Sequence, residues 1–278
     1  MNNIRLIVAD KDGTLTYASD DLSPRTKATI DKLREHGIYF GIATGRNLEQ
    51  QVMHFAERWG FERNFELCLG MNGGEVYDAL QDKTTCIYPL KTEWMREIMA
   101  YVAANPDLRA IKYYGDTSLN FGPVDEENEE QRKRSGRKPM IVTDSVDLFC
   151  AEETPKIMVG ASPERIREVD AYFKAHPNPY WHAFQTTNVM IEFMDKRVSK
   201  GNALEIFCKD NDIDLKDVMA FGDQANDISM IKVAGIGVCL ANGSQETKDA
   251  SDYVTDLPVE EDGFADFIEK HIFIPNNW

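Results

Sequence analysis

Short apolar runs alternate with longer amphipathic stretches in the first quarter of the chain. The runs contain few polar residues, which is typical of strands buried on both faces of a parallel sheet. The first three are residues 4–9, 39–43 and 66–69. Ser23-Pro24 predicts the start of a helix that runs to about His36, and a second helix is predicted over 48–59. This strand and helix order predicts a doubly wound, Rossmann-like α/β core.

The pattern changes after residue 74. The elements expected there are a hairpin over 75–90, helices over 93–104 and 163–175, and strands over 110–114, 119–121, 156–160, 181–186 and 189–193. Their mixture predicts an α+β domain with antiparallel character, inserted at 90–195, so that 1–89 and 196–278 form the core. The densely charged stretch from Asp125 to Lys138 is predicted to be a solvated loop or surface helix.

After the insertion, the alternation of short apolar strands and helices returns. A helix begins at Lys200, with Ser199 as its cap, and a C-terminal helix closes the chain. The strands predicted between them are 218–221, 236–240 and 253–255, and a helix that ends near Ala234 separates the first two. These elements complete the core on the far side of the insertion.

Polar clusters follow several of these strands. They are Asp10-Lys11-Asp12-Gly13-Thr14, Thr44-Gly45-Arg46, Lys200 at its helix start, and Gly222-Asp223 through Asp227. The carboxyl ends of parallel strands meet at one edge of a sheet, so we expect these clusters to converge. On a continuing strand, Asp10 and Asp12 would point to the same side and repel each other unless a cation or a shared proton lay between them. Several carboxylates, one lysine and one hydroxyl suit Mg²⁺ and a phosphoryl group.

Composition narrows the class of partner. The 278 residues include 31 basic and 47 acidic ones, a net charge of −16, which argues against nucleic-acid binding. The five cysteines are odd in number and form no CxxC pair, so we expect reduced thiols and a cytoplasmic location. Neither a signal peptide nor an apolar run of membrane-spanning length is recognisable. The expected oligomeric state is a monomer or a homodimer.

The four polar clusters match, in order, the four motifs of the haloacid dehalogenase superfamily. The chain more narrowly resembles the Cof-like phosphatases, on the basis of Asn72-Gly73-Gly74, the large insertion between the second and third motifs, and the C-terminal segment 250–263. Lys11 departs from the family, which usually has an apolar residue there. We expect its side chain to point away from the carboxylates and to have no catalytic consequence.

The resemblance implies a role for each motif residue. Asp10 would be the nucleophile that forms an aspartyl-phosphate, and Asp12 the acid and base. Mg²⁺ would be held by Asp10, the main-chain carbonyl of Asp12, and Asp223; Asp227 would either join the metal site or orient Lys200. Thr44 and Lys200 would bind phosphoryl oxygens. The remaining candidates for the phosphate pocket are Gly45, Arg46, Asn72, Gly73 and Asn226.

The resulting hypothesis is a Mg²⁺-dependent phosphatase of small phosphorylated metabolites, either sugar phosphates or a phosphorylated cofactor. The inserted cap domain would exclude water and select the leaving group. Two alternatives stay open at this point. One is a phosphomutase on the same scaffold, and the other is a non-catalytic binding protein with a residual site.

Overall fold

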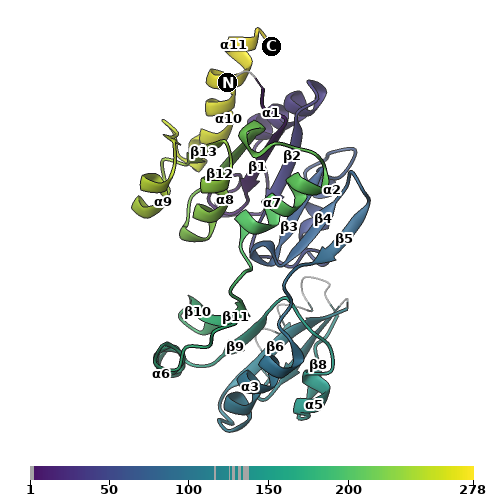
Figure 1. Cartoon of the computed structure of the whole chain (residues 1–278), viewed down its shortest axis with the longest axis vertical. Helices are drawn as coiled ribbons and strands as arrows, with labels where there is room; N and C mark the ends of the chain where they lie inside the picture. Colours follow the sequence, from purple (N-terminus) through teal and green to yellow (C-terminus); the bar gives the residue numbers. More distant parts are fainter. Residues whose placement is uncertain (1–2, 116, 125, 127–128, 131–132, 134–137) are drawn as a thin grey trace. The chain divides into compact units, whose positions relative to one another are not determined.

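The computed structural model describes residues 3–278 except 116, 125, 127–128, 131–132 and 134–137 (Figure 1). The chain divides into two compact units, which we call the core and the insert. The core is Met1–Ile87 with Val198–Trp278, and the insert is Tyr88–Arg197. These divisions differ by two residues on each side from the boundaries predicted from the sequence.

The core contains an eight-stranded sheet in the order β14-β13-β12-β1-β2-β3-β4-β5. Its strands are β1 (Leu6–Asp10), β2 (Tyr39–Ala43), β3 (Leu67–Gly70), β4 (Glu75–Asp78), β5 (Lys83–Cys86), β12 (Val218–Gly222), β13 (Ile236–Cys239) and β14 (Tyr253–Val254). The strands from β14 to β3 pair in parallel, and β4 and β5 add an antiparallel hairpin at one edge. The order confirms the predicted doubly wound core.

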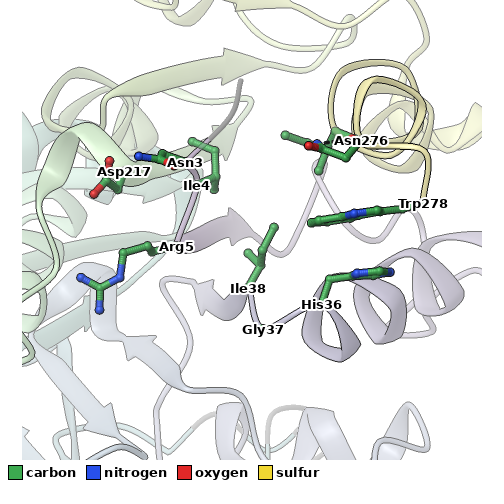
Figure 2. Close-up of a pocket in the computed structure, with 10 residues that line it drawn as sticks. Asn3, Ile4, Arg5, His36, Gly37, Ile38, Asp217, Asn276 and Trp278 are labelled. Carbon is green, nitrogen blue, oxygen red and sulfur yellow. Dashed lines mark hydrogen bonds between the residues drawn. The ribbon is translucent and has the colours of Figure 1, made fainter.

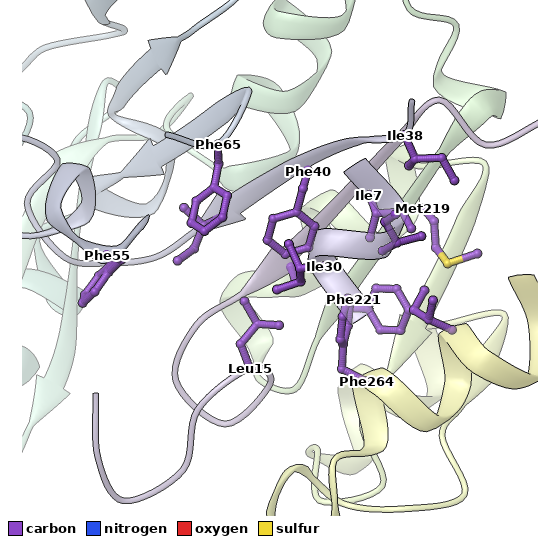
Figure 3. Packing of buried hydrophobic residues seen from close by; sticks show 14 of the residues in the cluster. Ile7, Leu15, Ile30, Ile38, Phe40, Phe55, Phe65, Met219, Phe221 and Phe264 are labelled. Carbon is purple, nitrogen blue, oxygen red and sulfur yellow. The ribbon is translucent and has the colours of Figure 1, made fainter. Parts of the chain in front are cut away.

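The central strand is apolar throughout because both of its faces are covered. Ile7 and Ala9 pack with the side chains of α1 (Pro24–Glu35) and α10 (Gly263–Ile268), and Figure 3 shows Ile7 in this cluster with Ile30 and Phe264. Leu6 and Val8 point to the opposite face and pack with α7 (Lys200–Asp210) and α8 (Ile228–Val233). Alternate residues of β1 therefore pack into two hydrophobic clusters on opposite faces of the sheet, so the sequence of this strand shows no alternation of apolar and polar residues.

The remaining helical segments of the core are short. They are η1 (Val52–His54), α2 (Phe55–Arg58), η2 (Met71–Gly73), η3 (Leu215–Asp217), η4 (Ala225–Asp227), α9 (Gln245–Ala250), η5 (Val259–Glu261), η6 (Glu269–Phe273) and α11 (Ile274–Asn276).

The continuous helix predicted over 48–59 is wrong, because the chain forms only η1 and α2 there. Asn47 Oδ1 accepts a hydrogen bond from the Gln50 backbone N–H at 2.7 Å, and the Glu75 carboxylate accepts from the Leu48 N–H at 3.0 Å. The backbone N–H groups of Val52 and Met53 bond to the carbonyls of Asn47 and Leu48, five residues earlier, in place of the four-residue spacing of an α-helix, so the chain makes a turn at this point.

The insert has its own six-stranded sheet, in the order β10-β11-β9-β6-β7-β8. Among its described residues, the strands are β6 (Arg109–Tyr114), β7 (Thr117–Phe121), β8 (Ile141–Thr143), β9 (Ile157–Gly160), β10 (Trp181–Thr187) and β11 (Met190–Asp195), and the helices are α3 (Thr92–Ala103), α5 (Val146–Phe149) and α6 (Pro163–Ala175). All neighbours are antiparallel except β7 and β8, which confirms the predicted α+β character. The prediction for Asp125–Lys138 falls mostly outside the described residues.

Two further expectations concern chemistry rather than topology. All five cysteines are free thiols, and only Cys86 is exposed. Within the described part of the chain, none of the helices combines the length and the apolar character that crossing a bilayer requires.

Candidate active site

Polar residues from four neighbouring strands come together at one edge of the core sheet. Asp10 is the last residue of β1, Thr44 directly follows β2, Asn72 lies just beyond β3, and Asp223 directly follows β12. Because β12, β1, β2 and β3 are adjacent and parallel, their carboxyl ends share one edge. The clusters predicted to converge therefore lie on the same side of the sheet.

Three carboxylates form the centre of this edge. Asp10, Asp223 and Asp227 each offer an oxygen, these oxygens lie within 4.8 Å of one another, and all three residues are buried. The Lys200 ammonium, which is fully buried, donates hydrogen bonds to Asp10 Oδ1 and, at 2.5 Å, to Asp227 Oδ1. One buried cation thus faces three buried acids, so the group has an excess of negative charge when all are ionised.

Burial is the largest influence on the pKa values of these groups, and their mutual charges also contribute. Burial raises the pKa of Asp10 to about 8, with Lys200 opposing the rise and Asp227 and Asp223 adding to it. Burial is also the main reason why the pKa of Asp223 is raised. Burial alone would lower the pKa of Lys200, but the charges of Asp10 and Asp227 outweigh it and raise that pKa above its usual value. Lys200 therefore stays charged, and the carboxylates hold a proton that a bound cation would displace.

The turn after β1 depends on a glycine. Gly13 has a φ of +91°, and a Cβ atom at this position would lie 2.4 Å from Asp223 Oδ2. Thr14 Oγ1 donates to Asp223 Oδ1 at 3.2 Å, and Gln224 Nε2 donates to Asp223 Oδ2 at 3.0 Å. The backbone can approach the Asp223 carboxylate this closely only because residue 13 has no side chain.

Asp227 accepts three hydrogen bonds from the protein itself. Its Oδ2 accepts from the backbone N–H groups of Asp223, at 2.9 Å, and Gln224, at 3.0 Å, while Oδ1 binds Lys200. The residue is 0% exposed. It therefore ties the turn after β12 to the Lys200 ammonium.

A second group of predicted residues surrounds Thr44. The Thr44 carbonyl accepts from the Asn72 N–H at 3.0 Å, and Asn226 Nδ2 donates to Asn72 Oδ1 at 3.2 Å. A Cβ on Gly45 would lie 3.1 Å from Asn72 Oδ1, so Gly45 leaves room for that amide. Gly73 packs elsewhere: its φ is +94°, and a Cβ there would meet the Ser199 carbonyl oxygen at 2.4 Å. Its contact is with the backbone just before α7.

The Asp12 side chain is not part of the three-carboxylate group. Arg46 donates from Nε to Asp12 Oδ2 at 3.0 Å and from Nη2 to Asp12 Oδ1 at 2.8 Å. Lys11 Nζ donates to the same Asp12 Oδ1 at 2.8 Å. The prediction that Lys11 points away from the carboxylates is therefore wrong for Asp12. Arg46, predicted to line the phosphate pocket, is paired with Asp12 and with Asp20.

Four residues of this region are not among the site residues predicted from the sequence: Lys11, Thr14, Asp20 and Gln224. Thr14 and Gln224 lie inside the predicted polar clusters, and their polar side chains next to Gly13 and Asp223 indicate that they belong to the site. No sequence pattern indicated Asp20, because an acidic residue in a predicted loop is ordinarily solvated.

A cavity of about 350 Å³ also exists in the core, but at the other edge of the sheet. Its lining includes Arg5, Ile38 and Asp217, which immediately precede β1, β2 and β12 at their amino ends. Figure 2 shows the Trp278 ring stacked on His36 at one side of this cavity, with centroids 3.9 Å apart. The cavity is therefore separate from the carboxylate group.

Comparison with known families gives one assignment over nearly the whole chain. A family model described as haloacid dehalogenase-like hydrolase matches residues 7–268.

Two relatives of assigned activity align over most of their lengths. A phosphoglycolate phosphatase of Methanopyrus kandleri is 29% identical over 275 residues, which cover 95% of this chain and 96% of the relative. The 5-amino-6-(5-phospho-D-ribitylamino)uracil phosphatase YcsE of Bacillus subtilis is 27% identical over 274 residues, covering 97% and 96%.

Solved structures agree on the fold. A Thermotoga maritima protein superimposes with a TM-score of 0.84 at 24% identity, over 96% of this chain and 97% of the other. A sugar phosphatase of haloacid dehalogenase subclass IIB gives a TM-score of 0.75 at 20% identity, over 96% and 98%.

Proposed function

This chain belongs to the haloacid dehalogenase-like hydrolases, and from that premise we propose that it is a phosphatase that uses Asp10 as its nucleophile and Mg²⁺ as its metal. One observation carries the proposal. A fully buried lysine joins two of three buried carboxylates at the carboxyl edge of a parallel sheet. Such a group needs a second source of positive charge. A divalent cation supplies that charge, and it binds the phosphoryl dianion of the substrate as well as the carboxylates.

The residues present fit a magnesium ion. The available donors are carboxylate oxygens, which are hard ligands, and one buried ammonium faces three buried carboxylates, so the group lacks positive charge. Asp10 and Asp223 would hold the metal, together with the main-chain carbonyl of Asp12. When bound, the ion neutralises charge on the transferring phosphoryl group. Asp227 already accepts three hydrogen bonds, which favours a role in orienting Lys200 over direct metal binding.

The chain's own residues then divide the work. Asp10 attacks phosphorus, the bond to the leaving oxygen breaks, and an aspartyl-phosphate forms. Asp12 gives a proton to the leaving oxygen and takes one from the water that hydrolyses the aspartyl-phosphate. Lys200 and Thr44 bind phosphoryl oxygens; Lys200 is held for this purpose by Asp227. Asn72 and Asn226, joined by their amides, line the same pocket.

The substrate class follows from chemistry and from relatives. The relatives named above act on phosphoglycolate and on a phosphorylated ribitylaminouracil, both small phosphoric monoesters. We extend the proposal to a small phosphorylated metabolite, a sugar phosphate or a phosphorylated cofactor, with the insert selecting the leaving group. The two relatives differ in substrate, so a panel of such esters is the appropriate screen.

The test is phosphate release from p-nitrophenyl phosphate and from that panel, with Mg²⁺ and with a chelator. We expect release only with the metal, and Asp10→Asn should abolish it. Asp31→Asn, which removes the same charge from α1 where Asp31 pairs with Lys27, is the matched control and should keep full activity. A fully active Asp10→Asn protein would overturn the mechanism. Phosphate appearing on a second substrate hydroxyl, measured by mass spectrometry, would indicate a phosphomutase.

A further inference from the structure

We propose that Lys11 is a positioning residue that, together with Arg46, holds the Asp12 carboxylate in place for proton transfer. The inference rests on the proposed function, because it assumes that Asp12 protonates the leaving oxygen. Lys11 and Arg46 favour the ionised carboxylate, so Asp12 takes up that proton when the bound phosphoryl dianion offsets their charge. It concerns a residue at which this chain departs from the pattern usual in the family.

Lys11 is placed as a fixed donor and not as a surface charge. Its side chain is 0% exposed, and its ammonium has three hydrogen-bond acceptors: Asp12 Oδ1 at 2.8 Å, Asp20 Oδ1 at 2.7 Å and Thr16 Oγ1 at 3.2 Å. An ammonium has three donors, so each one has a partner. The Phe55 ring lies 4.9 Å from Nζ and closes off another side. Lys11 thus cannot rotate without breaking a buried hydrogen bond.

Arg46 fixes the plane of the same carboxylate. Its Nε and Nη2 bind the two Asp12 oxygens as a fork, and its Nη1 lies 2.9 Å from Asp20 Oδ1. A forked guanidinium sets the orientation of a carboxylate as well as its position. Asp20 contacts both cations and so links them, and Arg58 approaches its other oxygen at 3.6 Å. We call Lys11, Arg46 and Asp20 the Asp12 clamp.

The backbone gives the clamp a rigid base. The N–H of Gly13 donates to the Thr16 carbonyl at 2.8 Å, and those of Leu15 and Thr16 donate to the Lys11 carbonyl at 3.0 and 2.9 Å. Asp12 is therefore carried on a closed loop from 11 to 16. Its side chain, by contrast, is 50% exposed, so packing does not fix its direction. The clamp supplies the constraint that packing does not.

Such a constraint matters for an acid catalyst. Proton transfer by a positioned group contributes roughly 10²- to 10⁴-fold to rate, and a misplacement of about 1 Å can cost about 10²-fold. The loss depends on the leaving group, because a weakly basic phenolate departs without a proton and a more basic one does not. Loss of the clamp should therefore penalise phenyl phosphate much more than p-nitrophenyl phosphate.

The experiment compares kcat/KM for these two esters in Lys11→Met, since kcat/KM covers the steps up to loss of the leaving group. We expect kcat/KM for phenyl phosphate to fall about 10- to 100-fold, mostly in kcat, and that for p-nitrophenyl phosphate to fall less than about threefold. Lys27→Met is the matched control: Lys27 also pairs with a carboxylate, Asp31, and lies over a phenylalanine ring, Phe61. It should change neither value.

Two further variants keep the proposal falsifiable if Lys11→Met folds poorly. Asp20→Asn leaves Lys11 in place but weakens the clamp, and should lower the phenyl to p-nitrophenyl ratio in the same direction by a smaller factor. Asp12→Asn should change the ratio of kcat/KM for the two esters more than any other variant, and adding Lys11→Met to it should change that ratio no further.

An equal loss for both esters in Lys11→Met and Asp20→Asn, or an effect of Lys11→Met that persists in Asp12→Asn, would overturn the clamp while leaving the proposed function intact. No phosphate release by the wild-type protein from either ester, nor from the metabolite panel, would overturn both proposals.

Discussion

Asp10→Asn should stabilise the metal-free protein, and the stabilisation should be about 2 kcal/mol larger at pH 8 than at pH 6. Burial raises the pKa of Asp10 to about 8, against 3.8 for an unperturbed aspartate. Between these values the folded protein holds a proton on Asp10 that the unfolded chain has lost. The folded state therefore binds more protons, and the free energy of unfolding falls as the pH rises toward 8. An asparagine at this position has no such proton to lose, so the variant lacks this part of the pH dependence.

The size of the effect follows from the linkage relation. One proton bound only by the folded state changes the free energy of unfolding by about 1.4 kcal/mol per pH unit. From pH 6 to a pH equal to the Asp10 pKa, the change integrates to about 2 kcal/mol. For a domain of this size that is roughly 4–8 °C in Tm. The Tm difference between variant and wild type should widen by this amount from pH 6 to pH 8.

Thermal unfolding of both proteins, in a chelator, at several pH values from 6 to 8 measures this directly. The buffer should be matched for ionic strength, so that surface charges contribute equally to both. Saturating Mg²⁺ should then raise the Tm of the wild type more at pH 8 than at pH 6, because at pH 6 the ion must displace the proton. Parallel pH profiles for the two metal-free proteins would refute the reasoning, since Asp10 would then be ionised throughout.

Three other substitutions test the geometry around the site. Gly13→Ala should lower the free energy of unfolding by about 1–2 kcal/mol, because residue 13 has a φ of +91°. Because the new Cβ displaces Asp223, it should also raise the Mg²⁺ concentration for half-maximal activity at least about tenfold, and an unchanged Mg²⁺ titration would contradict this. Lys200→Met should cost about 3–5 kcal/mol in urea unfolding without metal, and adding Asp10→Asn should recover part of it. Glu66→Ala should lower the free energy of unfolding by a similar amount, because Glu66 pairs with Arg34 in the core at 3.0 Å. The kcat of the folded enzyme should stay unchanged, and a large fall in kcat would connect this pair to the site.

The core was readable from the sequence because its strands are uniformly buried. β1 serves two hydrophobic clusters with alternate side chains, so five consecutive residues had to be apolar or site-forming. The polar residue after each strand then located the edge at which Asp10, Thr44 and Asp223 meet. The helix predicted over 48–59 does not form at its start, where the N–H groups of Val52 and Met53 bond to carbonyls five residues earlier and the Leu48 N–H bonds to Glu75. Glu75 is 27 residues from its partner Leu48, beyond the reach of a local pattern.

The error at Lys11 has a different origin. Alternation along a strand sends neighbouring side chains to opposite faces, and on that basis Lys11 was expected to point away from both acids. The strand, however, ends at Asp10, and Lys11 opens a loop in which its own carbonyl accepts from Leu15 and Thr16. In such a loop the period of two no longer applies, and side chains at 11 and 12 can meet. The same fact explains why Asp12 stands apart from the three-carboxylate group. Asp10 and Asp12 therefore have different surroundings because the strand ends between them. The sheet fixes Asp10, whereas the position of the Asp12 carboxylate depends on the side chains that bind it.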